Sequence, residues 1–185
     1  NKYDMETFHY GIDRLNAGIA LDICHGRIRG EIAPKAAEKI NGNRKVVENL
    51  VHQEKTVYGI NTGFGPLCTT IISEDHTREL QHNLLTSHSV GVGEYLAADI
   101  SRLMMILKVH SLSIGYSGIS LKTLQRIMWH IDHDVIPCVP SQGSVGASGD
   151  LAPLAHLFLP LVGKGEVFAR GKILPSDKVL HQYKL

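Results

Sequence analysis

The triplet Ala147, Ser148 and Gly149 can form a reactive group from the backbone itself. If the amide nitrogen of Gly149 attacks the carbonyl carbon of Ala147, a ring closes, and loss of the Ser148 hydroxyl as water leaves an exocyclic methylidene. The product, 4-methylidene-imidazol-5-one, is an electrophile that no ordinary side chain supplies. Position 149 requires glycine, because two backbone atoms must approach closely and a Cβ atom would obstruct them. The triplet therefore predicts a self-formed electrophile.

The residues around the triplet leave other interpretations open at this point. Gly143 and Gly146 relax the turn, and Asp150 either assists proton transfer or caps the helix that follows. Loops rich in glycine and serine ahead of a helix more often only turn the chain or bind an anion. A phosphate-binding loop does not fit, since no Lys-Ser or Lys-Thr pair follows the glycines. A nucleophile elbow does not fit either, because Asp150 occupies the place of its last glycine.

The whole segment 143–154 resembles, almost residue for residue, the self-cyclising motif of the histidine and aromatic amino acid ammonia-lyase family. A second segment, from Tyr58 to Gly65, is similar to the tyrosine loop of that family. Shorter matches extend the resemblance over nearly the whole chain, at residues 87–88, 91–94 and 115–118. The resemblance implies that the triplet becomes the cofactor, with no external cofactor and no metal, and that ring formation is supported by Gly146, Asp150 and Leu151.

The family resemblance also implies a fold and an assembly. We expect a mainly α-helical protein in which residues 1–185 are the N-terminal portion, with small β-hairpins and with the central long helices mostly beyond this chain. The last residues carry no natural ending, so the remainder of the enzyme would supply further active-site residues. We expect this portion to be inactive alone and to expose apolar surface. The assembly implied is a homotetramer whose active sites are shared between subunits.

The tyrosine loop is expected to supply the base. The reaction of this family removes a weakly acidic β-hydrogen from an amino acid while ammonia departs. Tyr58 is the candidate base. The unperturbed pKa of a phenol is about 10, so Tyr58 would need a lowered pKa to act as a base at neutral pH. By similarity, we expect Asn61, Thr62 and Gly65 to contact the substrate.

The pair Ser87-His88 occupies, by similarity, the position that selects the substrate. Family members that act on phenylalanine carry an apolar pair there, and those that act on histidine carry Ser-His. A histidine can exchange hydrogen bonds with a substrate imidazole. The expected reaction is conversion of L-histidine to urocanate and ammonia. A tyrosine or phenylalanine ammonia-lyase or aminomutase with the same electrophile is the alternative, and a non-catalytic helical interaction domain is a remote one, disfavoured by the intact Ser148.

Length and composition agree with an intracellular enzyme fragment, and the family resemblance implies a small amino-acid substrate. The 185 residues, 43% of them hydrophobic, can bury one core. The formal net charge of +1 gives no electrostatic reason to expect a nucleic acid or a membrane surface as partner. The chain has three cysteines and no C-x-x-C pair, which favours reduced thiols in the cytoplasm. The run from Leu151 to Val162 is too short to span a bilayer and is interpreted as a core helix.

Helical periodicity and capping signals place the expected elements. Pro34 begins a helix that reaches toward residue 55, Ser73 precedes a helix that ends at His88, and Ser120 caps a helix that Pro137 and Pro140 stop. Two further helices are expected at 100–115 and from residue 150 onward. Residues with β propensity around Arg-Gly turns predict hairpins at 23–32 and 167–174.

Two histidines lie one helical turn apart, at His130 and His133. Two such ligands without a third do not make a zinc site. We expect both to be solvated, whereas His156, within an apolar run, is expected to be partly buried and hydrogen-bonded.

Overall fold

The computed structural model describes residues 6–53, 57, 60, 62, 74–146 and 150–185, and residues 74–78 are described by their backbone only. Six of the predicted site residues lie outside the described residues, namely Tyr58, Asn61, Gly65, Ala147, Ser148 and Gly149. The other predicted site residues can be compared with the structure.

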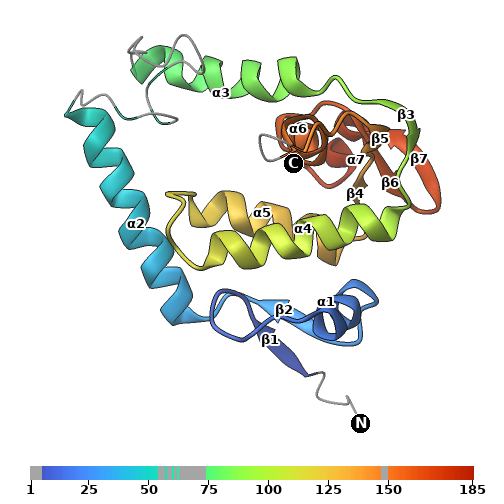
Figure 1. Cartoon of the computed structure of the whole chain (residues 1–185), viewed down its shortest axis with the longest axis horizontal. Helices are drawn as coiled ribbons and strands as arrows, with labels where there is room; N and C mark the ends of the chain where they lie inside the picture. Colours follow the sequence, from blue (N-terminus) through green and yellow to red (C-terminus); the bar gives the residue numbers. More distant parts are fainter. Residues whose placement is uncertain (1–5, 54–56, 58–59, 61, 63–73, 147–149) are drawn as a thin grey trace.

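Helices dominate the described chain, as predicted (Figure 1). The α-helices are α1 Ala17–Cys24, α2 Pro34–His52, α3 Glu74–His88, α4 Ala98–Ser113, α5 Leu121–Asp132, α6 Leu151–Phe158 and α7 Ser176–Gln182, and a 3-10 turn, η2, covers Leu159–Val162. The strands are β1 Thr7–His9, β2 Arg29–Glu31, β3 Val92–Tyr95, β4 Ile136–Pro137, β5 Pro140–Gln142, β6 Glu166–Ala169 and β7 Lys172–Pro175.

The strands form small sheets around the helices. Strands β1 and β2 pair in parallel, β3 pairs antiparallel with β5, and β4, β6 and β7 form an antiparallel sheet in that order. Figure 1 shows α4 and α5 side by side, with α1, β1 and β2 on one side of them and α6 with the C-terminal strands on the other. Helix α3 packs on α6, which places the C-terminal end of α3 near the loop that leads into α6.

The core is centred on α4 and α5 because both present apolar residues at helical spacing. Met105, Ile106 and Val109 of α4 are buried in one cluster with Leu124 and Ile127 of α5. Helix α6 packs on this part of the fold, since it also contacts α4.

The predicted helix signals are confirmed where they are local. Pro34 is in the first turn of α2, and the Ser120 hydroxyl accepts a hydrogen bond from the Thr123 amide at 3.1 Å at the start of α5. The predicted end of α5 is wrong. The helix ends at Asp132, before either proline, and Asp134 turns the chain with a φ of 54°. The two prolines lie instead in β4 and β5.

One predicted hairpin is confirmed and the other is wrong. Strands β6 and β7 are joined by Arg170 and Gly171, whose φ values of 53° and 71° are those of a tight hairpin turn. In 23–32, however, Ile23 and Cys24 are the buried end of α1, and the strand that follows pairs with β1 rather than with its neighbour.

The apolar run from Leu151 to Val162 is not one core helix. Helix α6 tightens into η2 before Pro160, which has no amide hydrogen to continue the helical pattern. Leu151 itself is 53% exposed. In the described part of the chain, no helix combines the length and apolarity that a membrane span requires.

Candidate active site

A pocket of about 300 Å³ brings two distant sequence motifs together. The end of α3 contributes one side and the two flanks of the Ala147-Ser148-Gly149 triplet contribute the other. The described lining residues are Ser87, His88, Val90, Gly143, Val145, Gly146, Asp150, Leu151 and Ala152. Five of these were predicted site residues, namely Ser87, His88, Gly146, Asp150 and Leu151, so the structure brings the predicted selectivity pair and the predicted ring-supporting residues to one pocket.

The side chain of His88 is held by its own helix. Its Nδ1 lies 2.9 Å from the carbonyl oxygen of Leu84 and 3.1 Å from the hydroxyl oxygen of Ser87. A carbonyl oxygen only accepts, so Nδ1 carries the proton that is donated to Leu84. In the neutral ring, Nε2 then has the lone pair. His88, which lines the pocket, therefore carries its hydrogen-bond acceptor on Nε2.

Asp150 binds Ser144 across the triplet. The Ser144 hydroxyl donates to the Asp150 carboxylate, so the two ends of the loop that carries the triplet are joined. Asp150 has a φ of 57° and stands at the N-cap of α6, but its side chain makes no capping hydrogen bond there. Of the two roles predicted for Asp150, helix capping by the side chain is thus wrong, because the carboxylate is taken up by Ser144.

The backbone comes very close to itself beside this loop. A Cβ atom on Gly91 would lie 3.2 Å from the Gln142 carbonyl oxygen and 3.2 Å from the His156 ring, and one on Gly143 would lie 3.0 Å from the Gly91 Cα. Glycine at both positions relieves this crowding, and Gly143 also has a φ of 148°, which other residues rarely adopt. The pairing of Val92 with Gln142 in β3 and β5 continues the contact.

Sequence reasoning missed the contact that Ser144 makes in this region, and it did not identify the partner of His156. His156 is half-buried and accepts a hydrogen bond from the Gly91 amide at 3.0 Å, as its predicted hydrogen-bonded role requires, but its partner lies far away in the sequence. Ser144 is a polar residue close to Asp150 in the sequence, and this proximity was the signal that could have predicted their contact.

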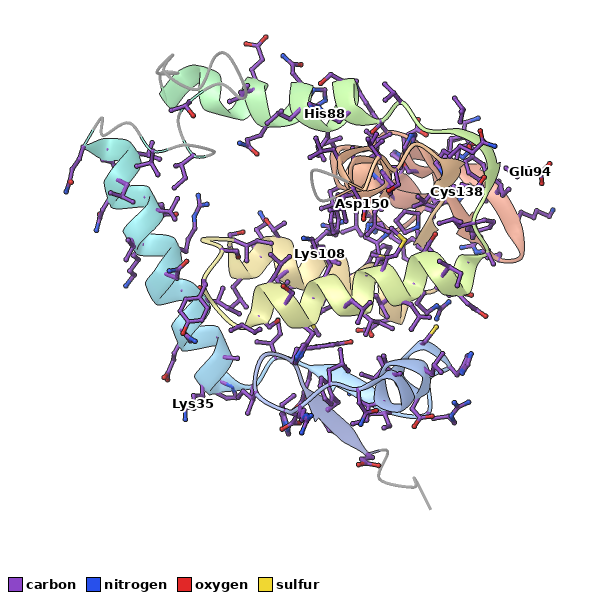
Figure 2. All side chains as sticks on the ribbon, in the orientation of Figure 1. Lys35, His88, Glu94, Lys108, Cys138 and Asp150 are labelled. Atoms are coloured by element: carbon purple, nitrogen blue, oxygen red, sulfur yellow. The ribbon has the colours of Figure 1, made fainter. Side chains whose placement is uncertain are left out.

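Thr62 is the one residue of the predicted tyrosine-loop contacts that the structure describes. It is fully buried, at 0% exposed, and is not among the described lining residues of the pocket. Its predicted contact with substrate is therefore not evident in the described part of the chain. Figure 2 labels the two residues that define the site best, His88 at the end of α3 and Asp150 ahead of α6.

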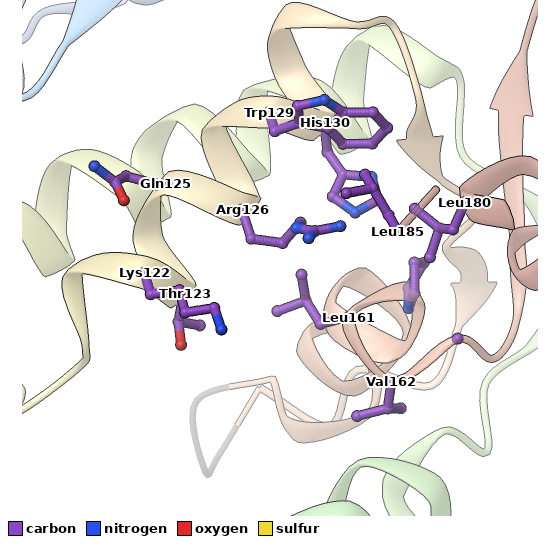
Figure 3. Close-up of a pocket in the computed structure, with 12 residues that line it drawn as sticks. Lys122, Thr123, Gln125, Arg126, Trp129, His130, Leu161, Val162, Leu180 and Leu185 are labelled. Atoms are coloured by element: carbon purple, nitrogen blue, oxygen red, sulfur yellow. The ribbon is translucent and has the colours of Figure 1, made fainter. Parts of the chain in front are cut away.

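A larger pocket, of about 710 Å³, lies between α5, η2 and α7 (Figure 3). It contains none of the predicted catalytic or substrate-binding residues, so its size does not make it the candidate active site.

His130 lines this pocket and is only 1% exposed, which corrects the prediction that it is solvated. Its Nδ1 donates to the Val135 carbonyl oxygen at 2.9 Å, because the helix turns it inward with Ile127 and Ile131. Burial lowers the pKa of His130. His133 is exposed, as predicted.

The sequence matches the family model described as "Aromatic amino acid lyase" over residues 15–185. The chain therefore belongs to the aromatic amino acid lyase family. Its mainly helical architecture agrees with that assignment.

Among individual relatives, a histidine ammonia-lyase of Legionella pneumophila is 47% identical over 149 residues, which are 80% of this chain and 29% of the relative. The solved histidine ammonia-lyase from Trypanosoma cruzi superposes with a TM-score of 0.87 at 35% identity, covering 98% of this chain and 35% of that one. An ergothionase from Treponema denticola superposes with a TM-score of 0.91 at 25% identity, covering 97% and 36%. The chain thus spans less than a third of the length of the Legionella relative.

Proposed function

We propose that residues 1–185 are the N-terminal portion of a carbon-nitrogen lyase that removes ammonia from L-histidine to give urocanate. The observation that carries this proposal is the pocket in which Ser87 and His88 face both flanks of the Ala147-Ser148-Gly149 triplet. The likeness to histidine ammonia-lyases at 47% and 35% identity supports it.

The triplet is the source of the cofactor in this proposal, 4-methylidene-imidazol-5-one. The described residues on both sides fit such a ring. Gly143 and Gly146 have φ values of 148° and 72°, and the Ser144 to Asp150 hydrogen bond closes the loop around the triplet. Flanks that are joined in this way suit the proposed attack of the Gly149 nitrogen on the Ala147 carbonyl carbon. The ring supplies an electrophile to the amino acid, and no external cofactor or metal is needed.

Substrate selection follows from the hydrogen bonding of His88. Because Nδ1 donates to the Leu84 carbonyl oxygen, Nε2 is an acceptor that suits the N–H group of a substrate imidazole. The phenyl ring of phenylalanine has no donor and would leave this acceptor unpaired. A polar group that loses its partner on binding costs far more than a weak apolar contact gains, so histidine is favoured over phenylalanine.

The tyrosine loop completes the proposal. Tyr58 acts as the base that takes the β-hydrogen, and Asn61, Thr62 and Gly65 contact the substrate. The selectivity pair, Ser87 and His88, binds the substrate side chain. Gly146, Asp150 and Leu151 support ring formation through the loop described above.

The assembly and location of the protein are further parts of the proposal. We infer a cytoplasmic homotetramer in which active sites are shared between subunits, without nucleic acid or membrane as partner. Exposed apolar side chains on the described surface support burial in a larger assembly, among them Leu107 of α4, Val90 and Leu151. This portion alone is inactive and aggregates.

Ammonia release by the full-length protein tests the function. The protein is incubated separately with L-histidine, L-tyrosine and L-phenylalanine, and the organic product is identified with the ammonia. Urocanate and ammonia from histidine support the proposal. A cinnamate-type product from an aromatic substrate would assign the alternative lyase, and a β-amino acid without ammonia would assign an aminomutase. No turnover of any of the three would favour a non-catalytic role.

A further inference from the structure

One side-chain hydrogen bond ties the end of α3 to α6. The amide N–H of Gly91 donates to Nε2 of His156, and the nitrogen atoms are 3.0 Å apart. Gly91 follows the selectivity pair closely, and His156 lies on the helix whose first residue, Leu151, lines the candidate pocket. The bond therefore connects the two walls of the pocket at a point outside it.

The same short segment is held from its other side by the chain that enters the ring-forming loop. A Cβ atom on Gly91 would lie 3.2 Å from the Gln142 carbonyl oxygen, and the adjacent Val92 pairs with Gln142. Residues before the triplet and a residue after it thus both contact Gly91. A shift of Gly91 would move the end of α3 relative to the triplet.

The hydrogen bond from Gly91 fixes which ring nitrogen of His156 carries the proton. An amide N–H only donates, so Nε2 must carry the lone pair and the ring proton must be on Nδ1. Burial lowers the pKa of His156, which keeps this acceptor available at neutral pH. A side chain without an acceptor would leave the partly buried Gly91 amide without this partner, and the conformation that depends on the hydrogen bond would lose stability.

We propose that His156 is a positioning residue for substrate recognition, which acts through Gly91 to set the place of Ser87 and His88 relative to the Ala147-Ser148-Gly149 triplet. This inference rests on the proposed function, since it assigns the substrate side chain to that pair. His156 itself does not line the pocket and is not a catalytic residue.

The chain offers a matched control. His110 on α4 is also half-buried, and its Nδ1 accepts a hydrogen bond from the Gly11 amide at 3.3 Å. Burial lowers the pKa of His110 as well. This second histidine-to-glycine bond joins α4 to the N-terminal part of the fold, and neither residue lines the candidate pocket.

Three variants of the full-length protein separate positioning from a general structural effect. His156→Leu removes the acceptor and should raise KM for L-histidine about tenfold, with a smaller change in kcat, because the substrate side chain is misplaced. His156→Gln restores an acceptor oxygen with similar reach and should bring KM back within about threefold of the wild type. His110→Leu should lower Tm but leave KM as in the wild type.

Hydrogen exchange of the peptide that covers residues 87–91 gives a readout independent of activity. Exchange should be faster in His156→Leu, and should match the wild type in His156→Gln and in His110→Leu. An unchanged KM and unchanged exchange in His156→Leu would overturn the inference, as would an equal rise in KM in His110→Leu. Failure of the proposed function is seen separately, as a wild-type protein that releases no ammonia from histidine, and in that case the exchange comparison alone decides the role of His156.

Discussion

His88 and Asp150 line one pocket from the ends of two different helices. His88 is the last residue of α3, and Asp150 immediately precedes the first residue of α6. A helix carries partial negative charge at its C-terminal end and partial positive charge at its N-terminal end. The pocket is therefore bounded by two helix ends of opposite partial charge, and the Asp150 carboxylate lies at the positive one.

Exchange of the selectivity pair should change the preferred substrate. Replacing Ser87 by Phe and His88 by Leu removes the polar partner of the imidazole and leaves an apolar wall. We expect kcat/KM for L-histidine to fall by about 10²-fold or more and kcat/KM for L-phenylalanine to rise modestly. Steady-state kinetics with both substrates measure this.

Thr86→Ala is the control for that exchange, because Thr86 lies on the same helical turn and its hydroxyl bonds the His82 carbonyl oxygen without lining the pocket. It should keep wild-type kinetics. Unchanged histidine kinetics in the double variant would show that the pair does not select the substrate.

Removal of the proposed base should slow the reaction itself. Tyr58→Phe keeps an aromatic ring but deletes the hydroxyl that accepts the proton. We expect kcat to drop by about 10² or more with little change in Tm. Tyr183→Phe is the control, since Tyr183 packs against Trp129 away from the pocket. Turnover within a few-fold of the wild type in Tyr58→Phe would rule out this base.

Local signals in the sequence were sufficient for much of the fold. Pro34, Ser120 and the Arg170-Gly171 turn act on residues next to them, and each has the predicted place in the structure. The family resemblance singled out Ser87 and His88, and both line the candidate pocket. Periodicity alone carries no such long-range information.

The errors come from partners that are distant in the sequence or that compete locally. The strand at 29–31 pairs with β1, and no pattern within 23–32 contains that partner. His130 is buried because its helix faces the core there, and the Val135 carbonyl oxygen accepts a hydrogen bond from its Nδ1. Asp150 binds Ser144 instead of capping α6, since a nearby hydroxyl competes for the carboxylate.

Alanine substitutions at two glycines should have opposite effects on the stability of the protein. Gly42 lies within α2, and a Cβ there would meet nothing within 4 Å. Gly42→Ala should therefore stabilise the protein by about 1 kcal/mol, because alanine loses less backbone freedom on folding. At Gly30 the Cβ would lie 2.3 Å from the Tyr10 ring, so Gly30→Ala should destabilise it. Thermal unfolding of the two variants tests both signs, and a lower Tm for Gly42→Ala would contradict the helix argument.

We expect the folded protein to lose stability as the pH falls, because the burial of histidines makes them harder to protonate in the folded state. Burial lowers the pKa of His130, so the folded protein takes up a proton there less readily than the unfolded chain. The stabilising contribution is complete above the unfolded pKa of about 6.5 and is lost as the pH falls through the lowered folded pKa. His110 and His156 shift in the same direction. We expect the wild-type Tm to drop between about pH 7.5 and about pH 5.5, and the drop to be smaller in His130→Gln. An equal drop in both proteins would show that His130 does not contribute.

The mass of the peptide that contains Ala147, Ser148 and Gly149 tests the central claim most directly. Cyclisation and dehydration each release one water molecule, so in the active full-length protein this peptide should be lighter than its sequence mass by two water molecules. Ser148→Ala removes the leaving hydroxyl, and it should prevent dehydration and abolish both the near-ultraviolet absorbance of the ring and ammonia release while the protein still folds. An unmodified peptide in wild-type protein that releases ammonia from histidine would contradict the account.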